Sequence, residues 1–319
     1  QIKKILLNYG TITNNDSVIT YTNSEFENFN LITNTTQGII TTNENFINKV
    51  ISATNNDSVD LTGILGTITN SGTINHKVNL FTSKGLITNN GTINNYATMK
   101  NDVYGIVNNN SNIVNNSNFN NSHIINNKAS SFINNRNTFT NDKTVNIEAT
   151  STINNYSSFT NNDLLNIIAN GVYVNKSQST TTNTKIIDNF GLITIEDSST
   201  LHLNATSDLN NKANANINNN GTINSKKTST FINDGTFTNK SGNETMRGLV
   251  NIYGLVKNNN IVSNSGKFDI KADQGLFENY LNLTNDSIII SAGTIKNFKV
   301  ATTTNNHYIL NNNLIKNYG

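Results

Sequence analysis

The chain has 319 residues, of which 72 are asparagine and none is cysteine, proline or tryptophan, and its formal net charge at pH 7 is +2. The lack of cysteine excludes disulfide scaffolds and thiolate metal sites. The near-neutral charge and the presence of only two arginines, Arg136 and Arg247, argue against nucleic acid as a partner. Apolar runs reach only three residues, as in Ile288–Ile290, so we also expect no membrane-spanning helix.

A five-residue pattern, Gly-x-(Ile/Val/Phe)-x-Asn, recurs along the chain. Its copies begin at Gly10, Gly66, Gly85, Gly91, Gly105, Gly235, Gly254, Gly275 and Gly293, and degenerate copies begin at Ser111, Ser117 and Ser151. The central apolar residues follow one another in steps of six, as in Ile87, Ile93 and Met99, and longer steps of about eight intervene. These steps add up to a second period of about 20 residues, which is typical of a repeat architecture.

The step of six predicts β-strands, because six is even and side chains in a strand alternate between two faces. Each copy is then a short strand whose central apolar residue and last asparagine point inward, while threonine or lysine between them points to solvent. Glycine, serine and paired asparagines supply the bends, where a positive φ is tolerated. Three strands per 20 residues predict an all-β, parallel β-solenoid of roughly 16 coils and about 75 Å in length. We expect it to form a single domain over residues 1–319.

The abundance of asparagine agrees with this fold. Stacked amides on successive coils can donate to and accept from one another, which predicts inward asparagine ladders. The absence of proline also agrees, because proline would remove a backbone donor from a strand. An antiparallel sandwich or barrel would instead need hairpin turns every 8–12 residues or so, which the step of six does not allow. Four segments fit the pattern poorly, and we expect longer corner loops there: residues 44–62, 176–190, 198–215 and 299–308.

The rhythm Asn-x-Gly-x-Ile-x-Asn, carried best by Asn89–Asn95 and Asn219–Asn224, resembles bacterial surface proteins of the filamentous-haemagglutinin and autotransporter-passenger type. The resemblance covers most of the chain as a style of repeat. It implies a right-handed, three-faced β-helix that is exported and displayed at a cell surface. The secretion route and the anchoring of that family do not carry over to these residues.

No constellation of side chains predicts chemistry. The histidines lie at neither helical nor metal-ligand spacing, and we expect them at the surface or at corners: His76, His123, His202 and His307. Lys267, Asp269, Lys271 and Asp273 form a mixed charged patch, which we interpret as a solvated face. We therefore expect no catalytic, metal-binding or cofactor-binding residue, no cofactor and no enzymatic activity.

Two minor alternatives and a set of modification sites remain open. A carbohydrate-active β-helix enzyme would need clustered carboxylates, and outward threonine pairs such as Thr67 and Thr69 resemble an ice-binding face without repeating on consecutive coils. Asn-x-Ser/Thr sequons matter only if the host glycosylates exported proteins. They include Asn34, Asn90, Asn155, Asn204, Asn220 and Asn282.

The two ends of the sequence are alike, as Ile5–Gly10 and Leu314–Gly319 show. The start at Gln1, without methionine, suggests a mature chain after removal of a signal segment, or a fragment. A solenoid end is an open sheet edge, and no helical cap is evident at either end. We expect the ends to pair between subunits head to tail, which generates a filament. A longer solenoid that has lost its caps is the alternative. The expected interface residues are Ile5, Leu7, Asn8, Ile12, Asn14, Leu310, Asn312, Ile315 and Asn317.

The sequence thus favours a secreted, non-enzymatic structural subunit that stacks into a cell-surface filament or layer, with itself as partner. The alternative is an adhesin passenger or stalk that displays loops for attachment. In that case residues 176–190 or 198–215 are the candidate patch, and cell-surface glycans or proteins are the partners.

Overall fold

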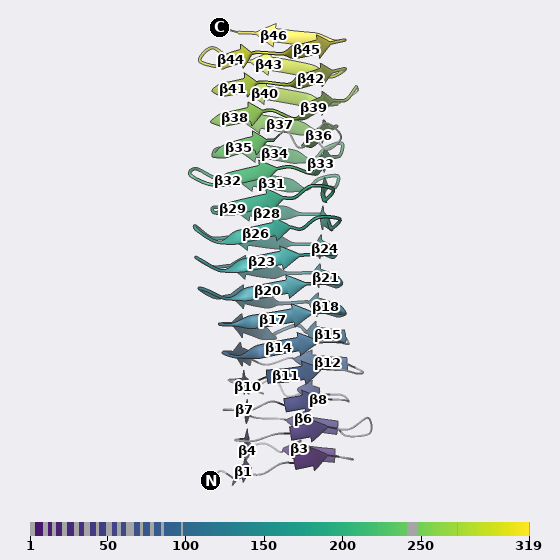
Figure 1. Ribbon diagram of the computed structural model, residues 1–319, viewed down its shortest axis with the longest axis vertical. Helices are drawn as coiled ribbons and strands as arrows, with labels where there is room; N and C mark the ends of the chain where they lie inside the picture. Colours follow the sequence, from purple (N-terminus) through teal and green to yellow (C-terminus); the bar gives the residue numbers. More distant parts are fainter. Residues whose placement is uncertain are drawn as a thin grey trace. The chain divides into compact units, whose positions relative to one another are not determined.

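A computed structural model of the chain describes the backbone of strands from Lys4 onward, together with the side chains of Ser83 and of residues 86–96, 98–240, 248–272 and 274–318. The described ordered elements are 46 β-strands, most of them four residues long. The chain divides into two compact units, Gln1–Ile153 and Asn154–Gly319, which are built on the same plan (Figure 1). β23 (Thr152–Asn155) spans the boundary.

In the first unit the strands form three sheets. One sheet contains β1 (Lys4–Asn8), β4 (Ser24–Asn28), β7 (Asn45–Asn48), β10 (Thr67–Asn70), β13 (Leu86–Asn89), β16 (Ile106–Asn109), β19 (Ile124–Asn127) and β22 (Thr144–Ile147). The next contains β2 (Ile12–Asn14), β5 (Ile32–Asn34), β8 (Ala53–Asn55), β11 (Thr73–His76), β14 (Thr92–Asn95), β17 (Asn112–Asn115) and β20 (Phe132–Asn135). The last contains β3 (Ser17–Thr20), β6 (Ile39–Thr42), β9 (Val59–Leu61), β12 (Leu80–Ser83), β15 (Thr98–Asn101), β18 (Asn118–Asn121) and β21 (Thr138–Asn141).

In the second unit we name the sheets A, B and C. Sheet A contains β25 (Leu164–Ile167), β28 (Ile186–Asn189), β31 (Asp208–Asn211), β34 (Thr230–Asn233), β37 (Leu255–Asn258), β40 (Leu276–Asn279), β43 (Thr294–Asn297) and β46 (Leu314–Asn317). Sheet B contains β26 (Val172–Asn175), β29 (Leu192–Ile195), β32 (Asn216–Asn219), β35 (Thr236–Asn239), β38 (Ile261–Asn264), β41 (Asn282–Asn285) and β44 (Thr302–Asn305). Sheet C contains β24 (Ser158–Asn161), β27 (Thr180–Asn183), β30 (Thr200–Leu203), β33 (Thr222–Ser225), β36 (Leu249–Ile252), β39 (Lys267–Ile270), β42 (Ile288–Ser291) and β45 (Tyr308–Asn311).

Within each unit every strand pairs in parallel with the strand three places further along the chain, as β13 does with β16 and β28 with β31. Three strands therefore make one coil, and coils stack in register (Figure 1). This confirms the predicted parallel β-solenoid, with three strands and about 20 residues per coil.

The second and fourth residues of a strand point into the solenoid. In β13, Ile87 and Asn89 are fully buried, whereas Leu86 and Thr88 on either side of Ile87 are half-buried. Nearly all described strands share this alternation, which confirms the predicted inward apolar residue and inward asparagine. Aromatic rings stack in the second position: the centroids of Phe119 and Phe139 lie 4.9 Å apart in successive coils. Burying each such side chain stabilises the fold by about 1.5–3 kcal/mol.

The two step lengths of the sequence correspond to two kinds of corner. A two-residue corner such as Asn90–Gly91 and a four-residue strand give a step of six, and a four-residue corner gives a step of eight. The long corner 128–131 is a turn closed by the Ser131 amide, which donates to the Lys128 carbonyl over 3.1 Å. Its third residue, Ser130, has a φ of 61°.

Glycine has a different role from the one predicted. Positive φ falls on nine described non-glycine residues, each of them the third residue of a four-residue corner, and on none of the described glycines. Glycine instead allows close approach of corners: a Cβ on Gly191 would lie 2.2 Å from the carbonyl oxygen of Gly171 in the coil before it. The expectation that glycine supplies positive φ at the bends is therefore wrong. What requires glycine at such a corner is the lack of space for a Cβ beside the neighbouring coil.

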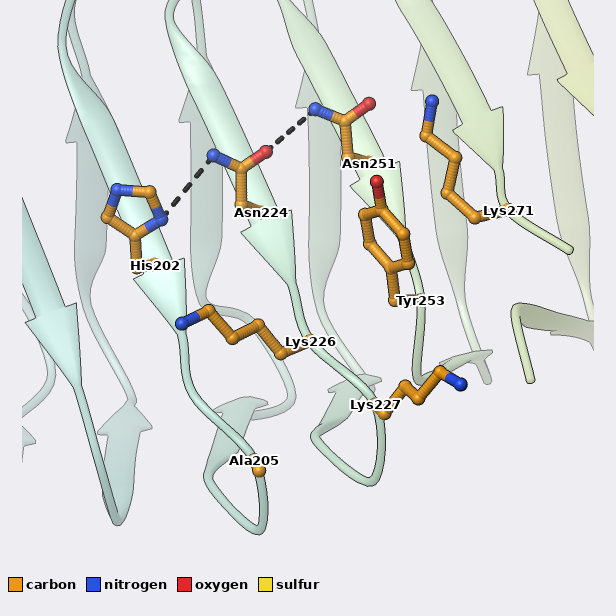
Figure 2. Close-up of a pocket in the computed structure, with 8 residues that line it drawn as sticks. All are labelled: His202, Ala205, Asn224, Lys226, Lys227, Asn251, Tyr253 and Lys271. Carbon is orange, nitrogen blue, oxygen red and sulfur yellow. Dashed lines mark hydrogen bonds between the residues drawn. The ribbon is translucent and has the colours of Figure 1, made fainter. Parts of the chain in front are cut away.

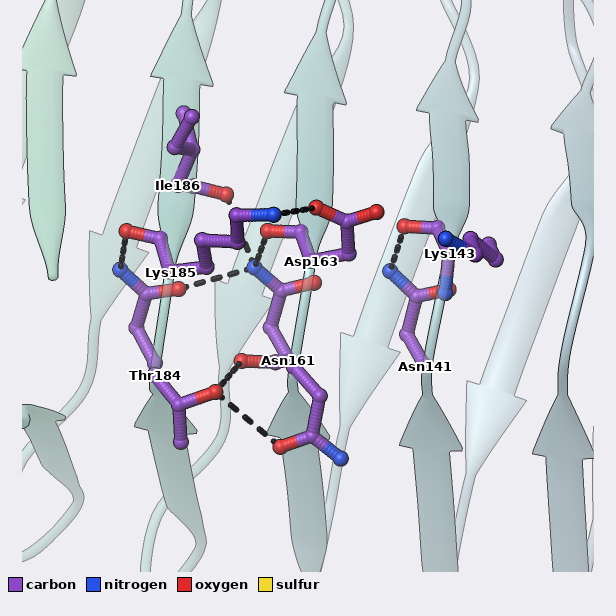
Figure 3. A network of polar contacts seen from close by, with 9 residues as sticks. Asn141, Lys143, Asn161, Asp163, Thr184, Lys185 and Ile186 are labelled. Carbon is purple, nitrogen blue, oxygen red and sulfur yellow. Dashed lines mark hydrogen bonds and ion pairs between the residues drawn. The ribbon is translucent and has the colours of Figure 1, made fainter.

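The fourth-position asparagines form ladders, as predicted. In one rung the Nδ2 of Asn161 donates to Oδ1 of Asn183 over 2.8 Å. The same nitrogen donates to the backbone carbonyls of Asp163 and Ile186, and Figure 3 shows these three residues. The Asn161 amide thus ties its own corner to the next coil, so its buried donor group is hydrogen-bonded although water has no access to it.

The segments that fit the pattern poorly combine long corners with regular strands. Residues 176–190 and 198–215 contain the long corners 176–179, 204–207 and 212–215, separated by β27, β30 and β31. Residues 299–308 contain the end of the corner 298–301 and β44. In segment 44–62, residues 49–52 and 56–58 lie outside the described residues.

Candidate functional site

On the outer surface of the second unit, corners of different length lie next to one another and leave a groove between them. The long corner 226–229 is followed, one coil on, by the short corner Tyr253–Gly254 and then by the longer corner that begins at Lys271. The resulting groove has a volume of 610 Å³ and is shown in Figure 2. It is lined by His202, Ala205, Asn224, Lys226, Lys227, Asn251, Tyr253 and Lys271. We call it the Tyr253 groove.

A row of polar side chains crosses this groove on the outer face of sheet C. His202, Asn224 and Asn251 occupy the same register position on β30, β33 and β36. The Nδ2 of Asn251 donates to Oδ1 of Asn224 over 2.7 Å, and Nδ2 of Asn224 lies 3.4 Å from Nδ1 of His202 (Figure 2). Partial burial, aided by the positive charge of Lys226, lowers the pKa of His202. The imidazole is therefore neutral at pH 7, so its Nδ1 can accept a hydrogen bond.

Lysines supply the charge of the groove. Lys226 and Lys227 are exposed on one corner, and Lys226 extends toward the strand of His202 (Figure 2). Lys271 lies on the opposite side and forms an ion pair of 2.6 Å with Asp269. Of the described residues that line the groove, three are lysines and none is acidic. The groove is therefore a basic recess on a chain of low net charge.

The carboxylate beside the groove, that of Asp269, is already paired with two lysines. Asp269 contacts Lys271 and also Lys267, the latter at 3.2 Å. Partial burial opposes ionisation, but the hydrogen bonds from the two lysines outweigh it and lower the pKa of Asp269. The mixed charged patch of the sequence is thus an ion-paired cluster as far as the structure describes it; Asp273 lies outside the described residues.

An aromatic ring stands on the short corner of the groove. The side chain of Tyr253 is 40% exposed and rises between Asn251 and Lys271 (Figure 2). The Nζ of Lys271 lies 5.9 Å from the ring centroid. Gly254 holds this corner close to the preceding one, because a Cβ there would lie 2.3 Å from the Ser229 carbonyl.

A second groove repeats the arrangement in the same unit. The short corner Phe190–Gly191 lies between the long corners 168–171 and 212–215, and the groove there has a volume of 370 Å³. The ring of Phe190 is 45% exposed, and Nζ of Lys212 lies 5.9 Å from its centroid. Alternation of corner lengths therefore produces an aromatic recess with a neighbouring lysine at two places.

The predicted interface residues occupy the first two strands and the last two of the chain. Ile315 and Asn317 hold inward positions in β46, whereas Leu310 holds an outward position in β45 and Asn312 lies on the corner between them. Ile5, Leu7, Asn8, Ile12 and Asn14 lie in β1 and β2, where only the backbone is described. When the strand pairing is followed from coil to coil, Leu6 holds the same register position as the buried Ile87. The predicted residues Ile5 and Leu7 are its neighbours on either side.

The sequons differ in accessibility. Asn90 and Asn282 are exposed, and Asn204 and Asn220 are half-buried. Asn155 is fully buried and donates to Oδ1 of Asn175 over 2.9 Å, so its amide is enclosed in the folded unit. Asn34 lies in β5, of which only the backbone is described.

Sequence reasoning placed the candidate patch partly within 198–215 but missed the groove. His202 was expected at the surface or at a corner and lies half-buried on the outer face of a strand. One coil of 22 residues and one of 27 separate His202 from Asn251, so a fixed repeat length in the sequence does not bring the two residues together. The available signal was an aromatic residue directly after the fourth strand position, because Tyr96, Tyr156, Phe190 and Tyr253 share that place and are all exposed.

The described residues were also compared with the requirements of a metal site and of a membrane-spanning helix, and they meet neither. Among the described residues, no group of three or more histidine or acidic side chains is placed to hold a metal ion. The same part of the chain contains no helix long and apolar enough to cross a membrane.

Comparison of the chain with protein-family models, with curated proteins and with solved structures gave no significant match to any of them. The resemblance to filamentous-haemagglutinin-like and autotransporter-passenger proteins therefore stays a prediction, and what the chain is shown to be is a parallel β-solenoid with asparagine ladders.

Proposed function

We propose that this protein is a non-enzymatic structural subunit, exported to the cell surface, whose solenoids stack head to tail into a filament or layer. The observation that carries the proposal is that each coil buries the inward side chains of the coil before it in register, as comparison with the coil β44–β46 illustrates. Ile315 is 44% exposed there, whereas Ile295 and Phe277, at the same register position one and two coils earlier, are 4% and 1% exposed. Inward side chains are thus buried by the next coil, and any coil without a successor is a template for another one.

The side chains at this coil match those expected on an incoming first coil. An aromatic stack runs along the corner position after sheet A: ring centroids lie 4.0 Å apart for Tyr280 and Phe298, and 5.2 Å apart for Phe298 and Tyr318. In sequence, Tyr9 follows Asn8 as Tyr318 follows Asn317. A second copy of the chain would thus add an asparagine to the ladder and a ring to the stack.

The ladders give this contact a direction. In the described inner columns each asparagine Nδ2 donates toward the coil of higher residue number, as Asn264 does to Asn285 and Asn285 to Asn305. A coil therefore offers amide donors to the coil after it and side-chain carbonyls to the coil before it. Head-to-tail stacking continues this pattern, and head-to-head stacking would oppose like groups.

The test is electron microscopy and sedimentation velocity over a concentration series. We expect the wild-type chain to form rods that lengthen with concentration. Ile315→Lys should stay monomeric with unchanged circular dichroism, because a charge would enter the apolar interface. Leu314→Lys is the matched control, since Leu314 is an outward residue of the same strand, 41% exposed, and should assemble like wild type. Monomers at every concentration, or assembly by Ile315→Lys, would overturn the interface.

A second candidate function is attachment, as an adhesin-like stalk. The Tyr253 groove favours it, because a basic recess with an exposed ring is a feature of binding surfaces rather than of a plain rod. A screen of the purified chain against immobilised saccharides and host-surface proteins tests this function. Antibody labelling of intact producing cells tests the proposed surface location in either case.

A further inference from the structure

The Tyr253 groove combines three recognition features that the stacking of coils does not require. It has ammonium groups on two sides, from Lys226 and Lys271, an exposed ring on its floor, and a hydrogen-bonded row of uncharged polar groups. The inner columns hold the coils together without any of these groups. A ligand that satisfies all three needs an anionic group, a face able to lie against a ring, and hydroxyl groups.

We propose that the Tyr253 groove binds an acidic oligosaccharide, in which a carboxylated sugar ring lies against Tyr253 and carboxylates of the chain are held by Lys226 on one side and by Lys271 on the other. Lysine suits this task as a mobile point charge, whereas the bidentate clamp that arginine would provide is absent from the groove. The binding of a sugar depends on both a ring and polar partners, because a sugar has an apolar face and a polar rim.

The polar row completes the match to hydroxyl groups. With Nδ1 of His202 accepting from Asn224, the imidazole carries its proton on Nε2 and presents a donor. At the other end, Oδ1 of Asn251 presents an acceptor, since the amide of Asn251 donates to Asn224 through its nitrogen. A donor and an acceptor separated by one amide can hold two hydroxyl groups of one sugar chain.

The second groove argues that the arrangement is more than one accident of packing. Phe190 and Lys212 repeat the pairing of an exposed ring with a lysine at the same distance of 5.9 Å as Tyr253 and Lys271. Only the Tyr253 groove adds further lysines and the polar row among its described lining residues. It is therefore the one for which an acidic ligand is proposed.

The experiment measures the binding of defined oligosaccharides to the full chain by isothermal titration calorimetry. The probes are an oligogalacturonate, a sulfated oligosaccharide of similar length, a neutral cello-oligosaccharide, and a single-stranded oligonucleotide. The variants are Tyr253→Ala and Lys226→Gln. The matched controls are Tyr156→Ala, an exposed tyrosine at the same corner position, and Lys143→Gln, a lysine of the other unit.

We expect the oligogalacturonate to bind and the neutral oligosaccharide not to bind. Tyr253→Ala and Lys226→Gln should each weaken binding by about five- to ten-fold, and both controls should bind like wild type. Stronger binding of the sulfated probe with the same loss in the variants would keep an acidic saccharide as ligand and change its acidic group. Binding of the oligonucleotide at equal strength, no binding of either acidic sugar, or binding unaffected by both variants would overturn the proposal. Filament formation is measured separately, so failure here leaves the stacking proposal intact.

Discussion

Two columns of the second unit hold the same place in their strands and differ in content. At the fourth position of sheet A, seven successive coils carry asparagine, from Asn189 to Asn317. At the fourth position of sheet C, the column runs Asn183, Leu203, Ser225, Ile252, Ile270, Ser291 and Asn311. The sheet A column is buried up to Asn279, and the sheet C column is buried up to Ser291.

We infer from this difference that a buried asparagine stabilises the solenoid where asparagines on the neighbouring coils complete the hydrogen bonds of its amide. Along sheet A each amide from Asn211 to Asn258 accepts from the coil before it and donates to the coil after it, with ladder distances of 2.7–2.9 Å, and Asn189, which follows Ile167, begins the ladder as a donor. In sheet C the apolar residues need no partners, and the serines bond locally, as Ser225 does with Ser229 over 2.8 Å. The sheet with the mixed inner column is also the one that carries the Tyr253 groove on its outer face.

The largest effect is expected from breaking the continuous column. Asn211→Leu removes the acceptor of Asn189 and the donor of Asn233, both at 2.7 Å, and leaves two buried amides incomplete. The free energy of unfolding should fall by about 3 kcal/mol, measured by guanidinium titration with circular dichroism. The control is Asn210→Leu at the adjacent outward position, where the loss should be below about 1 kcal/mol. Equal losses would show that the ladder adds nothing beyond an ordinary polar contact.

A smaller effect of opposite sign is expected from completing a broken column. In sheet B, Ile195 interrupts the ladder between Asn175 and Asn219, and the buried Oδ1 of Asn219 has no hydrogen-bond partner. Ile195→Asn would supply a donor to Asn219 and an acceptor for Asn175. The free energy of unfolding should rise by about 1 kcal/mol, because the restored hydrogen bonds outweigh the lost apolar contacts. A decrease in the same titration would mean that the aliphatic packing of Ile195 is the stronger term.

The smallest effect is expected from polar contacts outside the columns. Lys185 and Asp163 form an ion pair of 3.0 Å on the surface, next to the buried rung of Asn161 (Figure 3). The lysine side chain is 58% exposed, so water and salt screen the attraction. Lys185→Gln should change the unfolding free energy by less than about 0.5 kcal/mol. A loss of unfolding free energy as large as that of Asn211→Leu would show that a surface ion pair stabilises the fold as much as the inner ladder does.

Much of the fold followed from the sequence because every strand repeats the same local rule. The step of six identified the inward residues, such as Ile87 and Ile93, and the asparagine after them. The role of glycine was misjudged because the space around Gly191 is set by the neighbouring coil, which a local pattern does not reveal. The groove escaped prediction for the same reason, since Lys226 and Tyr253 meet only through the difference in length between two stacked corners.

The two corner lengths carry a rule for how such a chain can change. From Ile87 to Phe237, corners contain two or four residues, so every inward position is separated from the next by an even number. A duplication or deletion of two residues at such a corner changes the outline and leaves the interior untouched. An odd length is accommodated at the longer corner, because five residues separate β39 from β40 and Phe277 still points inward. At the level of the gene, variation among the two- and four-residue corners should come in blocks of six nucleotides, and such blocks can create recesses between stacked corners.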